Sequence, residues 1–361
     1  MHQRYDIRIF EKECKSLVKS GFDVSLIVND DLPDEEVDKI KIYSTNFQPK
    51  NRLNRMLNSN KKIFEKALEV NADIYHFHDP ELLPLGNKLK KLGKSVIFDS
   101  HENYTIQING KDYIPAILRK IISKLYFYYE TYSIRKYDAV IFPCTYNSQD
   151  PFENRAVRTV FIDNFPMLEE LYHIFDESTH KEKDAICYVG TLTEDRGITN
   201  IMEAAHKAEV KLVLGGIFTS ESYEQEVNNR SEFSCVDYRG YLNRKEVLEI
   251  YRKCQIGLST LLNVGQYNKG DHFPTKVYEY MAMGLPVILT DSKHVREVLK
   301  TYEIGIPVNP DDPKEISEAI LYLLKNPELA KKMGKDGRLA IKEKFNWGIE
   351  EQKLISLYES L

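Results

Sequence analysis

The stretch Asp271–Ile288 reads DHFPTKVYEYMAMGLPVI and is the most informative part of the chain. Pro274 stands where a helix can begin, Gly284 where that helix would end, and Pro286 leads into an apolar strand. The N-terminus of such a short helix is free. Its unpaired N–H groups and the helix dipole create positive potential at that end, so the pattern predicts a site for a phosphate or a diphosphate.

Two acidic residues accompany the predicted helix. Asp271 precedes it, and Glu279 lies a little more than one turn inside it. We therefore expect both carboxylates to flank the same pocket, where they would accept hydrogen bonds from sugar hydroxyls, because carboxylates repel phosphates. On spacing alone, an ordinary capped amphipathic helix is an equally good interpretation.

On both sides of this segment, short β-rich runs alternate with helical stretches, which is typical of parallel sheets covered by helices on both faces. The chain has 361 residues, enough for two domains. We therefore expect a doubly wound α/β protein with two sheets. The expected strands are 24–28, 74–77, 95–98 and 139–142 in the first sheet, and 185–189, 211–214, 236–238, 256–259 and 287–289 in the second.

Residues 164–184 are polar and weakly patterned, and we expect them to link a first domain of residues 1–163 to a second domain of residues 185–346. The substrate cleft would lie between the two domains. A helical pattern begins almost at once, with Ile9 and Val18 on the same face. The strand that normally opens a doubly wound domain is therefore missing from the expected order, which a late start codon or a shortened chain would explain.

Composition excludes several classes of protein. The 50 basic and 55 acidic side chains give a net charge of −5, so no global field attracts nucleic acid. The five cysteines form no C-x-x-C pair, and their odd number suits a reducing cytoplasm better than a disulfide framework or a structural zinc site. No stretch approaches the roughly 18–20 apolar residues of a membrane span, and no apolar signal core follows Met1.

Histidines and glycines at predicted strand ends are further candidates. His101 follows the strand 95–98, and ligands of open α/β sheets bind at such carboxyl ends, which favours a functional over a structural histidine. His76 and His78 occupy alternate positions and share a face, but no third ligand is evident, so we expect no metal. Gly215 ends another strand and would let a nucleotide approach closely, although a plain turn explains it equally well.

The segment 271–288 resembles the E-x7-E motif of retaining glycosyltransferases of family 4, in its variant P-T-K-x-x-E-Y-M-A-x-G-x-P-V-I. Other segments match in the same order, so the resemblance covers nearly the whole chain. It implies the GT-B fold, with an N-terminal acceptor domain, a nucleotide-sugar donor domain and a final helix, 347–361, that packs back on the first domain. It also implies that Asp271 contacts the donor hexose and Glu279 the ribose. Asp in place of the usual Glu shortens the first side chain by one methylene.

The loop YVGTLTEDRG (188–197) resembles the family's G-R-L-x-x-x-K-G pattern, whose two cations bind the diphosphate. Here Thr191 replaces the first cation and Arg196 stands for the Lys. In the family's D-x-H-E segment, matched by 99–102, the His is implied to hydrogen-bond the transferred sugar. The implied catalytic residues are His101, Arg196, Asp271 and Glu279; the implied donor-binding residues are Gly190, Thr191, Arg196, Gly215, Leu242, Phe273, Thr275, Lys276 and Glu279; and Arg4, Asp6 and His78 would line the acceptor cleft.

The hypothesis is a retaining enzyme that moves a hexose from a nucleoside diphosphate sugar to a hydroxyl of a glycan or lipid-linked acceptor in bacterial surface polysaccharide synthesis. The helix end, Arg196 and Lys276 would stabilise the leaving diphosphate, so neither a metal nor a cofactor is expected. Two alternatives remain. One is a catalytically inactive homologue that acts as a scaffold or sugar-binding partner. The other is a nucleotide-sugar epimerase, which shares the architecture.

Two basic stretches indicate a location in the cytoplasm with peripheral contact to the inner face of the cell membrane, because a basic amphipathic surface can rest on anionic lipid. Equally well, the apolar stripe of the second stretch is core and its charges form a solvated face. The first stretch holds Lys50, Arg52, Arg55, Lys61, Lys62 and Lys66; the second combines Leu118, Ile121, Ile122, Leu125, Tyr129 and Tyr132 with Arg119, Lys120, Lys124, Arg135 and Lys136.

Overall fold

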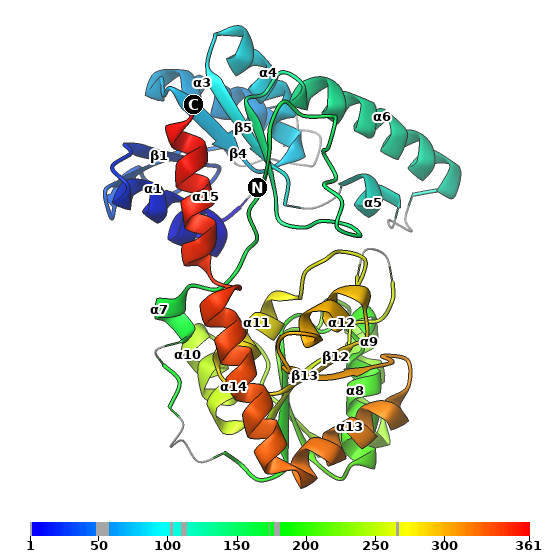
Figure 1. Ribbon diagram of the computed structural model, residues 1–361. Helices are drawn as coiled ribbons and strands as arrows, with labels where there is room; N and C mark the ends of the chain where they lie inside the picture. Colours follow the sequence, from blue (N-terminus) through cyan, green and yellow to red (C-terminus); the bar gives the residue numbers. More distant parts are fainter. Residues whose placement is uncertain are drawn as a thin grey trace. The chain divides into compact units, whose positions relative to one another are not determined.

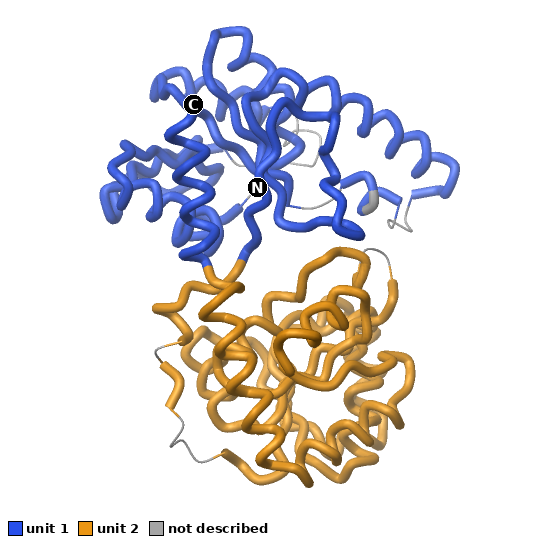
Figure 2. Tube along the Cα trace, in the orientation of Figure 1, with its two compact units in different colours: residues 1–164, 347–361 blue, residues 165–346 orange. Residues whose placement is uncertain are grey.

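The computed structural model describes residues 2–47, 58–101, 104–109, 114–172, 174–176, 181–264 and 267–361. Lys50, Arg52 and Arg55 of the first basic stretch, and Glu102 of the His101 motif, lie outside these described residues. The chain forms two compact units, which Figure 2 shows in different colours: unit 1 contains residues 1–164 and 347–361, and unit 2 contains residues 165–346. Among the described residues, no helix has both the length and the apolar character needed to cross a membrane.

Unit 2 is built on a parallel sheet of six strands in the order β10-β9-β8-β11-β12-β13. The order reverses between β8 and β11, so loops at the carboxyl ends of these two central strands can diverge around a ligand. β13 completes an edge of the sheet that the sequence analysis did not predict. The strands are β8 (Ala185–Val189), β9 (Lys211–Gly215), β10 (Val236–Tyr238), β11 (Ile256–Ser259), β12 (Val287–Thr290) and β13 (Gly305–Val308).

Apolar layers cover both faces of this sheet. Along β8, Cys187 and Val189 point into one layer while Ile186 and Tyr188 point into the other, as alternation in a strand requires. Part of the expected linker also belongs to the unit, because Phe165 and Leu171 lie in its core and Leu168 packs against it. The helices are α7 (Leu168–Leu171), α8 (Ile198–Lys207), α9 (Glu221–Asn228), α10 (Arg244–Lys253), α11 (Thr275–Ala282), α12 (Lys293–Leu299), α13 (Pro313–Lys325) and α14 (Pro327–Glu343), with the 3-10 turns η4 (Glu194–Arg196) and η5 (Ser231–Cys235).

Unit 1 contains two sheets. The larger is parallel and has the order β4-β5-β6-β7; the smaller has the order β1-β3-β2, with β2 antiparallel to β3. β1 is the first strand along the chain, and a helical segment precedes it. β2, β3 and β7 were not predicted. The strands are β1 (Val24–Val28), β2 (Glu35–Val37), β3 (Ile40–Ser44), β4 (Ile74–Phe77), β5 (Ser95–Asp99), β6 (Ala139–Phe142) and β7 (Thr159–Phe161).

The C-terminal helix α15 packs within unit 1 (Figure 1). The indole Nε1 of Trp347 donates a hydrogen bond to Ser16 Oγ at 2.9 Å, and Glu350 accepts one from the backbone N–H of Asp163 at 3.0 Å. Leu354 is fully buried on the same helix. The helices of the unit are η1 (Ile7–Cys14, a π-helix), α1 (Lys15–Lys19), α3 (Asn60–Val70), η3 (Pro80–Leu82, a 3-10 turn), α4 (Leu83–Lys91), α5 (Tyr104–Asn109), α6 (Ala116–Ile134) and α15 (Trp347–Glu359).

Shortening the buried side chain of α15 tests its part in this core. Leu354→Ala should lower the free energy of unfolding by about 2–5 kcal/mol, because it leaves a cavity. Ile349→Ala on the same helix, where the side chain is 38% exposed, should change it by less than about 0.5 kcal/mol. Urea unfolding followed by circular dichroism measures both, and equal effects of the two substitutions would contradict the packing of α15.

Candidate functional site

The principal candidate site of unit 2 lies where the strand order reverses. The loop that follows β8 contains Gly190 and Arg196, and the segment that follows β11 leads into α11. Pro274 precedes α11, no side chain caps the helix, and Gly284 follows it with φ +66°. Lys276 and Glu279 are three residues apart and so share a face of α11. The topology thus brings the two segments that carry the predicted cations to one end of the sheet.

Lys276 is a buried cation. Its side chain is only 6% exposed, and its Nζ has no hydrogen-bond partner in the part of the chain that the structure describes. The ammonium lies over the ring of Tyr188, 3.3 Å from the ring centroid. Burial, together with the positive charge of Arg196, holds the pKa of Lys276 well below its usual range. An anion bound beside this unpaired buried amine and the neighbouring guanidinium would stabilise both positive charges.

Gly190 and Arg196 approach the same tyrosine. A Cβ on Gly190, which has φ +143°, would lie 2.9 Å from Lys276 Nζ, so a side chain here would press on the ammonium. Arg196 ends the short turn η4, and its charge acts on both Tyr188 and Lys276. The hydroxyl of Tyr188 donates to the backbone oxygen of Thr191 at 3.1 Å. The structure therefore brings Gly190, Thr191, Arg196 and Lys276 together around Tyr188.

Glu279 is held by two residues that the sequence analysis missed. Its Oε1 accepts a hydrogen bond from Arg244 Nη1 at 2.8 Å, and its Oε2 accepts one from the Tyr251 hydroxyl at 2.9 Å. Arg244 also pairs with Glu170, its Nε lying 2.6 Å from Oε1. Asn243 and Glu246 form a capping box that fixes the start of α10 and hence the place of Arg244. The orientation of the Glu279 carboxylate is therefore set by α10.

The side chain of Leu242 occupies the space beside Gly215. A Cβ on Gly215 would overlap Leu242 Cδ1, so the glycine makes room for the leucine. Phe273 has its ring buried in the core, and its N–H donates to the Tyr278 hydroxyl at 3.1 Å. The ring of Phe273 consequently packs within the unit and does not face solvent.

Asp271 and Thr275 flank the start of α11. Thr275 is the first residue of the helix and is exposed. The charge of Asp271 acts on His272 and His294. Burial lowers the pKa of His294 to about 4, so this imidazole is neutral at pH 7.

His101 lies in a group of stacked imidazoles in unit 1. Its ring is nearly parallel to that of His78, with centroids 4.7 Å apart and planes 6° apart. Its Nδ1 lies 3.5 Å from Asp99 Oδ1. Burial lowers the pKa of His101 to about 4 and that of His78 well below its usual range, so both rings are neutral at pH 7. A neutral imidazole can donate or accept a hydrogen bond but adds no positive charge.

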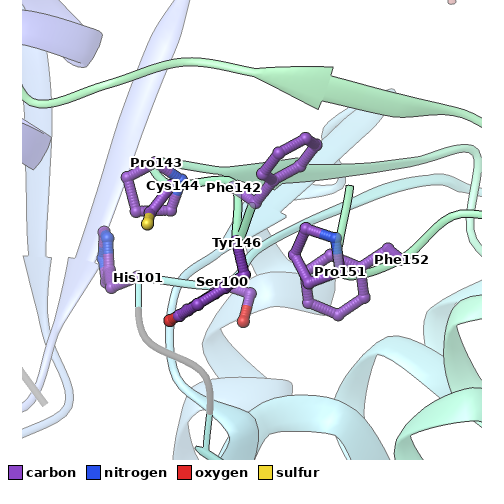
Figure 3. A pocket seen from close by; sticks show the side chains of 8 residues that line it. All are labelled: Ser100, His101, Phe142, Pro143, Cys144, Tyr146, Pro151 and Phe152. Carbon is purple, nitrogen blue, oxygen red and sulfur yellow. The ribbon is translucent and has the colours of Figure 1, made fainter. Parts of the chain in front are cut away.

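A small pocket lies beside His101, at the carboxyl ends of the neighbouring strands β5 and β6 (Figure 3). Open α/β sheets bind ligands at such ends. The pocket is lined by Ser100, His101, Phe142, Pro143, Cys144, Tyr146, Pro151 and Phe152.

Four residues near this point could hold a metal ion, because Glu13, His76, His78 and Asp99 each offer a ligand atom within 4.8 Å of the others. Arg8 already places a cation there. Its Nη2 donates to Asp99 Oδ2 at 2.7 Å, and its Nε lies 3.0 Å from Glu13 Oε1. Burial alone would raise the pKa of Asp99, but Arg8 and the imidazoles hold it well below its usual range. The guanidinium thus supplies the positive charge beside Asp99, whereas burial and the charge of Asp99 raise the pKa of Glu13 well above its usual range.

Arg4 and Asp6 are engaged within unit 1. All five guanidinium N–H groups of Arg4 are used, by the carboxylates of Asp30 and Glu35 and by the backbone oxygens of Leu32 and Pro33. Asp6 caps η1 by accepting from the N–H groups of the residues two and three positions after it. Every N–H group of the Arg4 guanidinium thus has a partner within unit 1, and its place in the acceptor cleft stays a prediction.

Two family models match the chain. Residues 173–340 match the model described as Glycosyl transferases group 1, and residues 10–150 match the model described as Glycosyltransferase Family 4. The uncharacterized glycosyltransferase MJ1178 of Methanocaldococcus jannaschii is 25% identical over 260 residues, covering 72% of this chain and 68% of the relative. The capsular polysaccharide biosynthesis glycosyltransferase CapM of Staphylococcus aureus is 25% identical over 202 residues, covering 54% of this chain and 49% of the relative.

Solved structures share the fold. Sucrose-phosphate synthase from Thermosynechococcus elongatus superimposes with a TM-score of 0.77 at 17% identity, covering 98% of this chain and 92% of that one. HepE from Anabaena, solved in complex with UDP and glucose, gives a TM-score of 0.68 at 13% identity and covers 94% of this chain and 99% of that one.

Replacing Lys276 by Met tests whether the amine is buried without a partner. A folded-state pKa below 10.5 means that the unfolded chain binds more protons, so Lys276 destabilises the fold at neutral pH, and this effect fades as the pH rises toward 10.5. Lys276→Met should therefore raise the free energy of unfolding at pH 7 by on the order of 1 kcal/mol, with a smaller gain at pH 10. Urea unfolding at both pH values measures this.

The matched control is Lys325→Met, an exposed lysine of unit 2, which should change the free energy of unfolding by less than about 0.5 kcal/mol. A loss of stability in Lys276→Met at pH 7 would contradict the unpaired state of the amine.

Proposed function

Since the chain belongs to the glycosyl transferases of group 1 and family 4, GT-B enzymes that transfer a sugar from a nucleotide sugar, we propose that it is a retaining hexosyltransferase. Its donor is a nucleoside diphosphate hexose, and its acceptor is a hydroxyl of a lipid-linked glycan intermediate in surface polysaccharide synthesis. The observation that carries this proposal is the buried amine of Lys276 next to Arg196, for which the described residues offer no hydrogen-bond partner.

The two cations suit a leaving diphosphate. Cleavage of the sugar–phosphate bond places negative charge on the diphosphate oxygens, and preorganised positive groups stabilise that charge in a site from which water is excluded. Arg196 can form a bidentate pair with phosphate oxygens. An arriving diphosphate favours protonation of Lys276, so the ammonium is available when charge develops. Thr191, in place of a second loop cation, contributes a neutral hydrogen bond.

The other residues orient the donor. Glu279, fixed by Arg244 and Tyr251, accepts hydrogen bonds from the ribose hydroxyls, and Asp271 contacts the hexose. The neutral imidazole of His101 hydrogen-bonds a hydroxyl of the transferred sugar. Unit 2 holds the donor and unit 1 the acceptor. The uncapped start of α11, at Thr275, adds the potential of the helix dipole to the diphosphate site.

Two comparisons support the choice of substrates. HepE was solved with UDP and glucose, which makes a uridine diphosphate hexose the first donor to test. The name of CapM places that relative in capsular polysaccharide biosynthesis, which supports a glycan acceptor. The cysteines of the described chain are all free thiols, which agrees with a cytoplasmic enzyme.

Product analysis tests the proposal directly. The chain is first screened against nucleotide sugars for thermal stabilisation, because a ligand of the folded state raises the melting temperature. The stabilising donor is then incubated with and without glycan acceptors. Acceptor-dependent transfer that keeps the anomeric configuration supports the proposal. Conversion of the donor without acceptor would indicate an epimerase, and donor binding without any conversion would indicate an inactive homologue.

Substitutions in the proposed diphosphate and ribose contacts should reduce kcat/KM. Arg196→Ala and Glu279→Ala should each lower it at least tenfold, on the order of 1.4 kcal/mol of lost transition-state stabilisation. Glu279→Gln keeps the shape of the side chain and separates loss of charge from loss of packing around Arg244.

Arg296→Ala is the matched control, because Arg296 is exposed in unit 2 and pairs with Asp291. It should leave kcat/KM unchanged. Unchanged kinetics in both Arg196→Ala and Glu279→Ala would contradict the assignment.

A further inference from the structure

Helix α6 of unit 1 carries its apolar side chains on the outside. Eight large hydrophobic residues of this helix are between 40% and 76% exposed. They include Ile117, Leu118, Ile121, Leu125, Tyr128 and Tyr132. In Figure 1 the helix extends along the edge of unit 1. The apolar stripe is therefore surface, which excludes the interpretation of the second basic stretch in which the stripe is core.

The inward face of α6 carries polar residues that are paired, together with Ile134, which is buried in the core of unit 1. Ser123 donates to the backbone oxygen of Thr105 at 3.1 Å, and Glu130 is buried and lies 2.5 Å from Arg155 Nη2. Ser133 accepts a hydrogen bond from Asn87 at 2.9 Å. Rotating the helix to bury its apolar face would break these contacts and leave partners such as Asn87 and Arg155 unpaired beneath apolar side chains, which is costly. The contacts of α6 with the rest of unit 1 thus keep its apolar face on the outside.

The exposed residues form one continuous surface. At about 100° per residue, the eight positions fall within a sector of about 140° on the helix, and positions 117 to 132 span about 22 Å along its axis. Scattered apolar side chains on a protein surface are ordinary, but a contiguous apolar patch of this kind marks an interaction site.

The charges beside this surface have one sign. Lys120, Lys124 and Arg135 are exposed on α6 or directly after it. Glu130 is the sole acidic residue between 116 and 136, and it is buried and paired. The surface is therefore apolar with a basic margin, which is complementary to a partner that is apolar inside and anionic at its boundary.

We propose that α6 is a membrane-docking helix that lies in the plane of an anionic bilayer surface. Its Ile and Leu side chains enter the boundary between headgroups and acyl chains, the three tyrosines lie at headgroup level, and the lysines contact lipid phosphates. A single projecting helix offers a convex surface, to which fluid lipid adapts. Docking would bring unit 1 to the lipid-linked acceptor of the proposed function, but lipid binding itself requires no sugar transfer.

Vesicle sedimentation of the full chain, without donor or acceptor, tests this proposal. The chain should bind vesicles in which one third of the phosphatidylcholine is replaced by phosphatidylglycerol, and bind pure phosphatidylcholine far less. Leu125→Glu should weaken the binding at least tenfold. The matched control is Val157→Glu, because Val157 is 70% exposed in unit 1 outside α6 and Leu125 is 64% exposed. The control should bind like the unsubstituted chain.

The double variant Lys120→Gln, Lys124→Gln should lose about 30-fold in affinity for the anionic vesicles, because each cation near such a surface contributes about fivefold. Circular dichroism and the melting temperature confirm that each variant is folded.

The proposal is overturned if the chain does not bind anionic vesicles, if it binds both kinds of vesicle equally, or if Leu125→Glu binds like Val157→Glu. Analytical ultracentrifugation tests the alternative that a second copy of the chain binds this surface. A dimer that Leu125→Glu dissociates, without vesicle binding, would assign the surface to a second copy of the chain and also overturn the proposal. Since the assay contains no sugar substrate, its failure leaves the proposed transfer reaction untouched.

Discussion

The central physical feature of unit 2 is the buried amine of Lys276, which has no hydrogen-bond partner among the described residues and a pKa well below its usual range. Removing a cation from water is costly unless a charge or a hydrogen bond compensates, and here a guanidinium adds repulsion. The parallel sheet accounts for this arrangement. Its strand order reverses between β8 and β11, so the loop with Gly190 and the start of α11 meet at one end. An anion bound there would offset both the desolvation cost and the repulsion. The fold without an anion is therefore less stable than it could be, and this loss of stability creates the binding site.

Unit 1 also buries several titratable groups, and there a guanidinium compensates the carboxylate of Asp99. Arg8 pairs with both Asp99 and Glu13, although burial raises the pKa of Glu13 well above its usual range. Burial keeps the imidazoles of His78 and His101 neutral. The stacked His78 and His101 then present hydrogen-bonding groups without net charge. The two units thus differ in their chemistry: unit 2 gathers the cations Arg196 and Lys276, and unit 1 presents the neutral imidazoles of His78 and His101.

Much of the fold was predictable from local pattern. The strands around 185–189 and 256–259 are short apolar runs buried on both faces, and such runs are recognised without tertiary information. Strands β2 and β13 were missed, because Glu35 and Glu36 or Pro307 interrupt the pattern at the edges of the sheets. The resemblance to the family located Lys276, Arg196 and Glu279, whereas Arg244 and Tyr251 are 35 and 28 residues from Glu279 and no local motif links them. The amphipathic pattern of α6 was visible, but it could not tell which face is buried. Which face is buried depends on the polar residues of α6 that pair with the rest of unit 1, such as Glu130 with Arg155.

The most direct test of the central claim is the proton balance of diphosphate binding. UDP, GDP and ADP are titrated into the full chain by calorimetry at pH 8.5, in two buffers that differ in ionisation enthalpy. At this pH the diphosphates are fully ionised, so protons taken up on binding go to the protein. The account predicts proton uptake with the nucleotide that binds, and loss of that uptake together with weaker binding in Lys276→Met. Binding without proton uptake, equally tight in both proteins, would contradict it.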